Sequence, residues 1–208
     1  MSKRNLSEPS KQQKKVIRDL STLEKQIADF EAAISEQATS NDYAKFDIDY
    51  KKEPSKTEPH VVFDMITNPY SRYPRDVVYR VINSKAELLE QSGNNIIPRF
   101  IRAGLDTARR VCLQRIILDW YISQLKDGRL KYRLNDAFED YRQNIKQALM
   151  ISFSSKYTEY DSVAAKKHVN ASLQDVVEIL RNEGEDELAD RILDIYNGSK
   201  IFGIKRQQ

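Results

Sequence analysis

The stretch that decides the fold is residues 98–126, PRFIRAGLDTARRVCLQRIILDWYISQLK. Pro98 suits the first turn of a helix, and Asp127-Gly128 provides an end after it. In the first half, apolar residues recur on one helical face at Ile101, Leu105, Ala108 and Cys112. The second half is apolar almost all round, which is typical of a helix buried on most sides. We therefore expect a central helix here, with Trp120 buried in a helical domain.

Helical spacing continues on both sides of this stretch, and it predicts a mostly α fold, a bundle of about five helices over residues 61–198. Ser84 and Glu87 have the spacing of a capping box, so we expect a break near Asn83. Ser172 is expected to cap a helix that ends at Gly184. A last helix over 185–197 ends at Gly198.

A narrow apolar seam precedes the bundle, with spacing 4-3-4-3-4 over Val16, Leu20, Leu23, Ile27, Phe30 and Ile34. This spacing is typical of the core positions of a coiled coil. An isolated helix of this length is marginal in water, so the seam needs a partner surface. Two interpretations stay open: an amphipathic helix packed on its own domain, or association with another copy or another protein through Leu20, Leu23, Ile27 and Phe30.

Residues 37–60 form a polar connection that contains Pro54 and Pro59. Inside it the apolar residues Phe46, Ile48 and Tyr50 alternate with acids, and Val61–Ile66 is a short apolar run of β-type residues. If the two runs pair, they form one short β-hairpin. The predicted organisation is a basic arm and coiled-coil-like helix over 1–38, a polar linker over 39–60, a central helical core over 61–160, and a C-terminal helical hairpin and tail over 161–208.

Composition limits the class of protein. No uncharged stretch approaches the ~18–20 residues that span a bilayer, and no apolar segment follows the basic start as in a signal peptide. The single cysteine, Cys112, cannot form an internal disulfide. We expect an intracellular protein, cytoplasmic or nuclear, with no membrane partner.

Few residues suggest chemistry. His60 and His168 have no second ligand at helical spacing, Cys112 resembles a small core residue, and no glycine-rich phosphate loop is present. Asp47 and Asp49 would share a face of a strand and could hold a divalent metal, but a solvated strand face explains them as well. We therefore expect no cofactor, no metal and no enzymatic activity, and a metal-dependent enzyme using Asp47 and Asp49 is a distant third hypothesis.

Arginines are the better candidates for a binding surface. The net charge of +3 is uneven, because residues 61–133 carry 13 basic and 7 acidic side chains. The arginines on one side of the central helix are Arg99, Arg102, Arg109 and Arg110, and Arg75 and Arg80 extend the surface. The planar guanidinium suits carboxylates and phosphates. Its counter-charge could be an internal acid (Asp106 or the acidic run 183–190), an acidic protein, or a nucleic-acid backbone.

These observations favour a non-enzymatic interaction or assembly subunit of an intracellular complex. It would bind an acidic partner through the arginine-rich face, and it would bind a protein or a second copy through residues 16–34. The alternative is a nucleic-acid-binding or regulatory protein that oligomerises through the same N-terminal helix.

Overall fold

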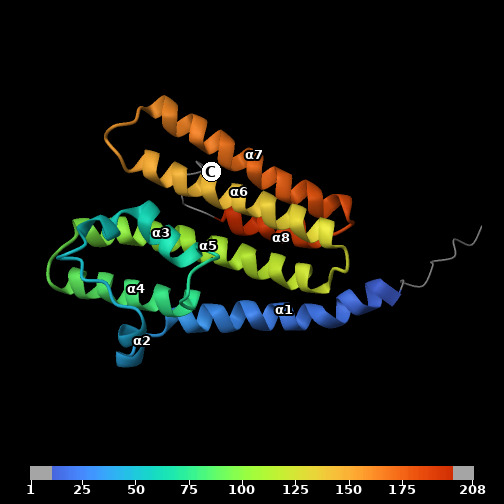
Figure 1. The fold of residues 1–208 in the computed structure, drawn as a ribbon, viewed down its shortest axis with the longest axis horizontal. Helices are drawn as coiled ribbons and strands as arrows, with labels where there is room; N and C mark the ends of the chain where they lie inside the picture. The colour runs from blue at the N-terminus through green and yellow to red at the C-terminus, as the bar shows by residue number, and fades with distance from the viewer. Residues whose placement is uncertain (1–10, 199–208) are drawn as a thin grey trace, which may run out of the picture.

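A computed structural model describes the backbone of residues 11–198 and the side chains from Leu20 to Gly198. The predicted basic arm, the C-terminal tail and the side chain of Val16 lie outside the described residues. Within 11–198 the regular structure is entirely helical, which confirms the predicted mostly α fold (Figure 1). The α-helices, with a short 3-10 helix η1 (Pro54–Thr57), are α1 (Lys11–Ser35), α2 (Ser40–Lys45), α3 (Pro59–Thr67), α4 (Arg75–Gln91), α5 (Ile96–Gln124), α6 (Gly128–Ser152), α7 (Glu159–Asn182) and α8 (Asp186–Asn197).

Helix α5 occupies the middle of the bundle. It packs against α1 and α4 on one side and against α6 and α8 on the other, and α7 covers α6 and α8 (Figure 1). The short α3 packs on α5 and contacts both α4 and α6. Its apolar second half is buried as predicted, with Trp120 only 6% exposed. Cys112 is also in this core, which confirms its assignment as a small core residue. No helix among the described residues combines the length and the apolarity needed to cross a bilayer.

The apolar run Val61–Ile66 is helical, so the prediction of a β-hairpin is wrong in the part of the chain that the structure describes. Pro59 starts α3 at its first position, where the missing N–H costs nothing. Val62, Phe63 and Ile66 then lie at i, i+1 and i+4, and all three are fully buried. The β-branched composition favoured a strand, but burial of one helical face decides the structure.

Two predicted helix starts are also wrong. Helix α4 runs through Asn83 without a break, and the buried Ser84 hydroxyl instead accepts a hydrogen bond from the backbone N–H of Ala38 at 3.0 Å. Ser172 lies inside α7 and donates to the carbonyl of His168 at 2.9 Å. The capping box of α7 is at Thr158, whose side chain and that of Asp161 satisfy each other's backbone N–H groups.

The part of the apolar seam whose side chains are described packs within the chain itself. Leu23 is fully buried and Ile34 is 5% exposed, while Leu20, Ile27 and Phe30 are partly buried against the same core. The surface that receives them is formed by α4 and α5. From Leu20 onward, α1 is thus an amphipathic helix on its own domain, one of the two interpretations that its spacing allows.

The segment 39–60 is more ordered than a polar linker. Thr39 and Asp42 form a capping box that starts α2, and Ile48 reaches the core with 1% exposure. The Asp42 carboxylate is buried and lies 3.2 Å from the Arg80 guanidinium of α4. The hydrogen bond from the Thr39 backbone is the main reason that the pKa of Asp42 falls to about 2.

Candidate functional site

Three residues of the predicted arginine-rich face make ion pairs with other helices of the chain. Arg102 contacts both carboxylate oxygens of Glu90 on α4, at 3.2 Å and 3.1 Å, and also bonds Asn83. Arg109 contacts Glu31 on α1, with Nη2 at 2.7 Å from Oε2. Hydrogen bonds to these acids raise the pKa of each arginine. These guanidinium groups therefore hold α1 and α4 against α5.

Arg80 belongs to the same set of paired arginines. It lies within α4 and binds Asp76 at 2.9 Å, Asp42 at 3.2 Å and the carbonyl of Ala33 at 3.1 Å. Its side chain is 11% exposed, so these partners also satisfy a nearly buried charge. The observed partners of Arg80, Arg102 and Arg109 come from α1, α2 and α4, rather than from the acidic run 183–190.

The other arginines of the predicted face differ from these three. Arg99 is exposed and makes no ion pair with the described residues. Arg110 is half-buried, its Nη1 atom has no hydrogen-bond partner there, and burial lowers its pKa. Arg75 lies 4.0 Å from Asp119. The structure thus does not present the six arginines as one free basic surface.

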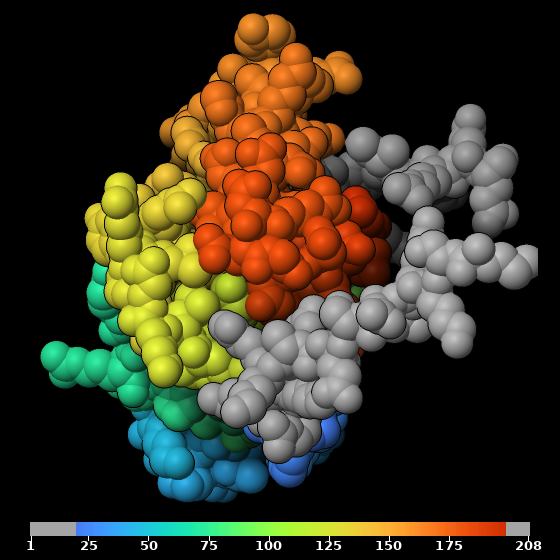
Figure 2. All heavy atoms as spheres, turned by 90° about the vertical axis from the view of Figure 1, so that its right-hand side faces the viewer, coloured from blue at the N-terminus to red at the C-terminus, as the bar shows by residue number. Residues whose placement is uncertain are grey.

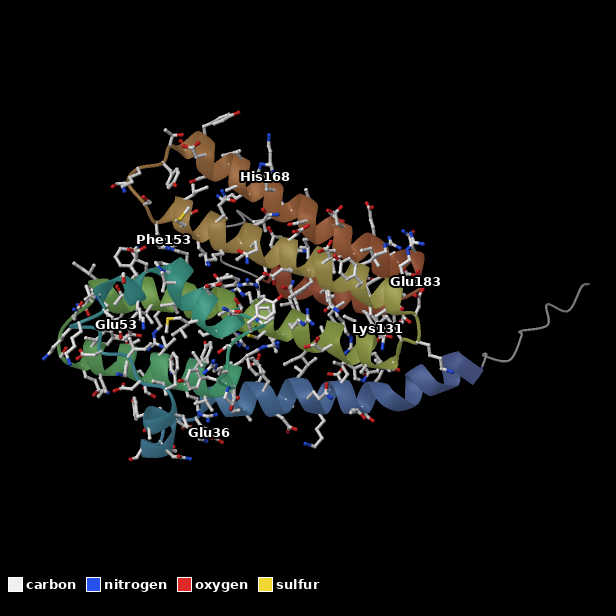
Figure 3. All side chains as sticks on the ribbon, in the orientation of Figure 1. Glu36, Glu53, Lys131, Phe153, His168 and Glu183 are labelled. Carbon is white, nitrogen blue, oxygen red and sulfur yellow. The ribbon has the colours of Figure 1, made fainter. Side chains whose placement is uncertain are left out.

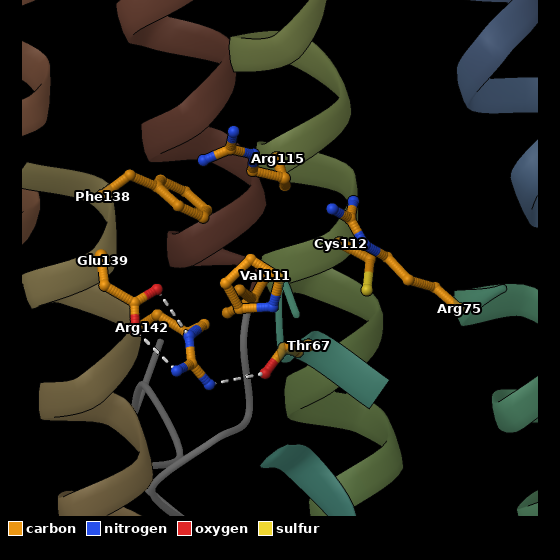
Figure 4. A pocket seen from close by; sticks show the side chains of 9 residues that line it. Thr67, Arg75, Val111, Cys112, Arg115, Phe138, Glu139 and Arg142 are labelled. Atoms are coloured by element: carbon orange, nitrogen blue, oxygen red, sulfur yellow. Dashed lines mark hydrogen bonds and ion pairs between the residues drawn. The ribbon is translucent and has the colours of Figure 1, made fainter. Parts of the chain in front are cut away.

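Arg75 instead faces a small cavity of about 20 Å³ between α5 and α6 (Figure 4). This volume suits about one water molecule. Arg115 lies at its edge, 5.5 Å from the centre of the Phe138 ring and 2.6 Å from Asp119. Cys112 also lines the cavity, and burial raises the pKa of its thiol to about 12, which makes it a poor nucleophile at neutral pH.

A larger concave surface lies at the end of the bundle where η1, α3, the start of α5 and the α6–α7 connection meet. It has a volume of about 770 Å³. Its apolar walls come from four helices and the α6–α7 connection, and they comprise Pro54, Pro59, Phe100, Met150, Phe153 and Tyr157. The Phe100 and Phe153 rings pack edge to face with centroids 5.8 Å apart, and Figure 3 shows Phe153 at this end.

A second recess, of about 450 Å³, lies next to the first, and His60 of α3 lines both. Its aromatic wall is the pair Phe46 and Tyr73, whose ring centroids are 5.1 Å apart. The remaining walls include Asp64, Arg72 and Lys146. We call the two recesses together the α3 groove, because α3 contributes the residue that they share.

Some charged groups of the α3 groove form ion pairs within the chain, and others form none with the described residues. Burial of Asp64 would raise its pKa, but hydrogen bonds from Lys146 (2.9 Å) and Arg142 (2.8 Å) outweigh burial and lower it. Burial lowers the pKa of His60, although Glu58 lies 3.5 Å away. Arg72 and Lys156 are exposed and make no ion pair with the described residues. The first recess also has the exposed carboxylate of Glu58, so the two unpaired cations outnumber one exposed acid and the net free charge of the groove is positive.

The carboxylates considered as metal ligands do not form a site. Asp47 bonds Lys85 and its own neighbouring backbone, and Asp49 pairs with Lys52 at 3.3 Å. They lie in an irregular segment and not on a strand, so the reason to expect one shared face is lost. The structure brings no three potential metal-ligating side chains together between residues 20 and 198.

Sequence reasoning missed the α3 groove. Its aromatic residues come from separate segments, and no spacing rule joins Phe46 or Phe100 to Phe153. One local signal was present: the segment 152–162, SFSSKYTEYDS, concentrates aromatic residues in a predicted loop. In the structure Phe153, Tyr157 and Tyr160 are 40%, 42% and 80% exposed. Exposed aromatics in a connection are a pointer to binding, because folding alone does not require them there.

Comparison with known proteins adds no assignment to this geometry. No family model matches the chain, and neither a curated protein nor a solved structure matches it.

Proposed function

We propose that the protein is a non-enzymatic interaction protein, an assembly subunit that holds a segment of a partner protein in the α3 groove. The observation that supports this most is the aromatic lining of the groove, where Phe153 and Tyr157 keep about two-fifths of their surface exposed. Covering apolar surface contributes roughly 25 cal/mol per Å². Aromatic side chains in pockets also dominate the binding energy of many protein interfaces.

The shape of the groove favours an extended segment over a compact ligand. Its two recesses meet at His60, and each has its own aromatic pair. A segment with two apolar side chains a few residues apart would fill both recesses with one continuous backbone. Polar groups such as Ser154 and Ser155 line the first recess and can bond that backbone.

The free charges favour an acidic segment. Arg72 and Lys156 are exposed at the groove, whereas the Asp64 carboxylate is already held by Arg142 and Lys146. Arg99, the exposed member of the predicted arginine-rich face, is next to Phe100 in the sequence and can extend this cationic character. An acidic partner was also expected from the sequence, but we place its binding at this end of the bundle.

Association through the N-terminal helix stays a prediction. The described seam residues are occupied by the chain's own α4 and α5. Binding through Leu20, Leu23, Ile27 and Phe30 would have to displace that packing.

A peptide library displayed on phage tests the proposed function. The full chain serves as bait, and the variant with Phe153→Asp and Tyr157→Ser serves for counter-selection. We expect the selected peptides to combine aromatic and acidic residues. Synthetic labelled copies should bind at least about tenfold more weakly to the variant with Arg72→Glu and Lys156→Glu, because two favourable charge contacts become repulsive.

The matched control is Tyr132→Ser, which removes an exposed tyrosine near the start of α6, next to Lys131 and far along the helix from Phe153. This variant should bind the selected peptides as the unmodified protein does. Peptides that bind the Phe153 and Tyr157 variant as tightly as the unmodified chain would show that the α3 groove is not the docking site.

A further inference from the structure

The end of the bundle opposite the α3 groove carries a cluster of cations around one acid, Asp127, whose side chain caps α6 by accepting from the backbone N–H groups of Arg129 and Leu130. We call Lys126, Arg129, Lys131 and Arg133 the basic turn, since they lie in and just after the α5–α6 connection. None of these side chains makes an ion pair with the described residues, in contrast to Arg102 and Arg109. Arg129 and Lys131 lie in the first turn of α6, where the helix dipole disfavours cations. Arg129 and Lys131 therefore do not stabilise the start of α6 through the helix dipole.

A second cluster of opposite charge lies on the same end. We call Glu183, Glu185 and Asp186 the acidic turn, since they lie in the α7–α8 connection and at the first position of α8. Glu187 follows them but already pairs with Arg191 at 3.2 Å. Glu185 is partly buried, and this burial together with the charges of Glu183 and Glu187 raises its pKa. The nearby Arg181 pairs with Asp190 at 3.0 Å, so the three acids of the acidic turn form no ion pair with the described residues.

The two turns lie side by side on one face. Figure 2 looks onto this end and shows the yellow α5–α6 turn beside the orange-red α7–α8 turn. In Figure 3 the labels Lys131 and Glu183 mark the same end. Glu183 and Glu185 also lie close enough to Tyr121 of α5 to contribute to its raised pKa. No ion pair joins the two turns within the described part of the chain.

We propose that this end face binds a second copy of the chain, with the basic turn of each copy against the acidic turn of the other. A two-fold axis between the turns produces both contacts at once, as in other isologous interfaces. Each contact relieves the repulsion inside both clusters. A nucleic acid lying on the basic turn would be repelled by the adjacent acidic turn, so the alternating charge favours the second copy.

The expected dimer is weak and sensitive to salt. Exposed ion pairs each contribute little, and salt screens them over about 10 Å at 0.1 M. Sedimentation equilibrium of the full chain over a range of protein concentrations therefore measures the dimer best at low salt. Raising NaCl from about 50 mM to about 500 mM should increase the dissociation constant at least about tenfold.

A charge-reversal experiment gives the sharpest test. One variant carries Arg129→Glu and Arg133→Glu, and the other carries Glu183→Lys and Asp186→Lys. Each variant alone should be monomeric, because the charge attraction is then lost in both contacts. An equimolar mixture should form the dimer again, because the reversed basic turn of one variant faces the reversed acidic turn of the other. Lys167→Glu with Glu178→Lys, exposed positions on α7, is the matched control and should leave the dimer unchanged.

Three results would overturn the proposal. The unmodified chain could stay monomeric at high concentration and low salt, or its dimer could persist in both reversed variants. It could also bind single-stranded oligonucleotides with a steep salt dependence that Arg129→Glu and Arg133→Glu abolish, without any dimer, and the basic turn would then be a nucleic-acid site. If Asp186→Lys weakens α8, the acidic-turn variant is replaced by Glu183→Lys alone. Its mixture with the Arg129→Glu and Arg133→Glu variant then tests the same dimer.

Discussion

Replacing Gly104 by alanine tests the packing that positions the α3 groove. Gly104 lies on α5 directly beneath α3. A Cβ atom at this position would lie 2.6 Å from the carbonyl oxygen of Pro59 and 2.8 Å from the Cβ of Val62. Neither neighbour is the end of a flexible side chain, so α3 as a whole has to move away from α5. Gly104 is therefore required by a close approach of two helices, although it stands in the interior of one.

The magnitude follows from two opposing terms. Alanine is better than glycine in a helix interior by about 1 kcal/mol. Overpacking a core typically costs about 1–3 kcal/mol and occasionally more. Three contacts shorter than ordinary van der Waals distance, at 2.6, 2.8 and 2.9 Å, place this site at the upper end. We expect a net loss of about 2 kcal/mol, which lowers the Tm of a chain of this size by about 4–8 °C.

Thermal unfolding followed by circular dichroism measures this loss, and Gly128→Ala is the matched control. A Cβ at Gly128 meets no heavy atom within 4 Å, so alanine there should leave the Tm unchanged or raise it. Peptide binding in the α3 groove should weaken in the Gly104→Ala variant, because Pro59 and His60 move with α3. The Gly128→Ala variant should bind the peptide normally. A Gly104→Ala protein that is more stable than the unmodified one would refute the close packing of α3 on α5.

Three further predictions concern the core and its charges. Trp120→Ala should cost about 3–5 kcal/mol in denaturant unfolding, since the ring is 6% exposed, and a red-shifted, freely quenchable tryptophan emission in the unmodified protein would contradict this. Arg109→Glu should lower the free energy of unfolding by about 1 kcal/mol, and the double variant with Glu31→Arg should recover that stability. If a double-mutant cycle shows no coupling energy between the two positions, the pair does not stabilise the fold. The folded pKa of Asp42, about 2, lies below its ordinary value near 3.8, so its contribution to stability should be present above pH 4 and lost as the pH falls toward 2. The Tm difference between the unmodified protein and Asp42→Asn should therefore shrink over that range, and a difference independent of pH would exclude this role.

The central helices could be predicted because their signal is long and local. The apolar run from Ile116 to Leu125 leaves a helix few alternatives to burial, and glycines such as Gly93 and Gly184 end helices where a positive φ is needed. The run Val61–Ile66 was too short to separate a strand from a buried helix by composition. Only its contact with Gly104 on α5 distinguishes them, and no local pattern contains that contact.

The arginine-rich face shows a different limit of sequence reasoning. The helical spacing of Arg102 and Arg109 correctly placed both on α5, but their counter-charges, Glu90 and Glu31, lie on two other helices. A sequence shows which charges share a helix face, whereas pairing depends on which helices become neighbours. The acidic run 183–190 was expected as a counter-charge because it concentrates acidic residues in the sequence. In the structure it does not pair with Arg102 or Arg109.

This distinction between paired and unpaired arginines also bears on function. A cation held by a carboxylate of the same chain must lose that contact before it binds a partner, so Arg102 and Arg109 are poor first contacts for an external anion. Some cations form no ion pair with the described residues and have no such contact to lose, namely Arg72 and Lys156 at one end and the basic turn at the other. Arg80, Arg102 and Arg109 therefore use charge to hold helices together, whereas in our two proposals the cations at the ends of the bundle select a partner.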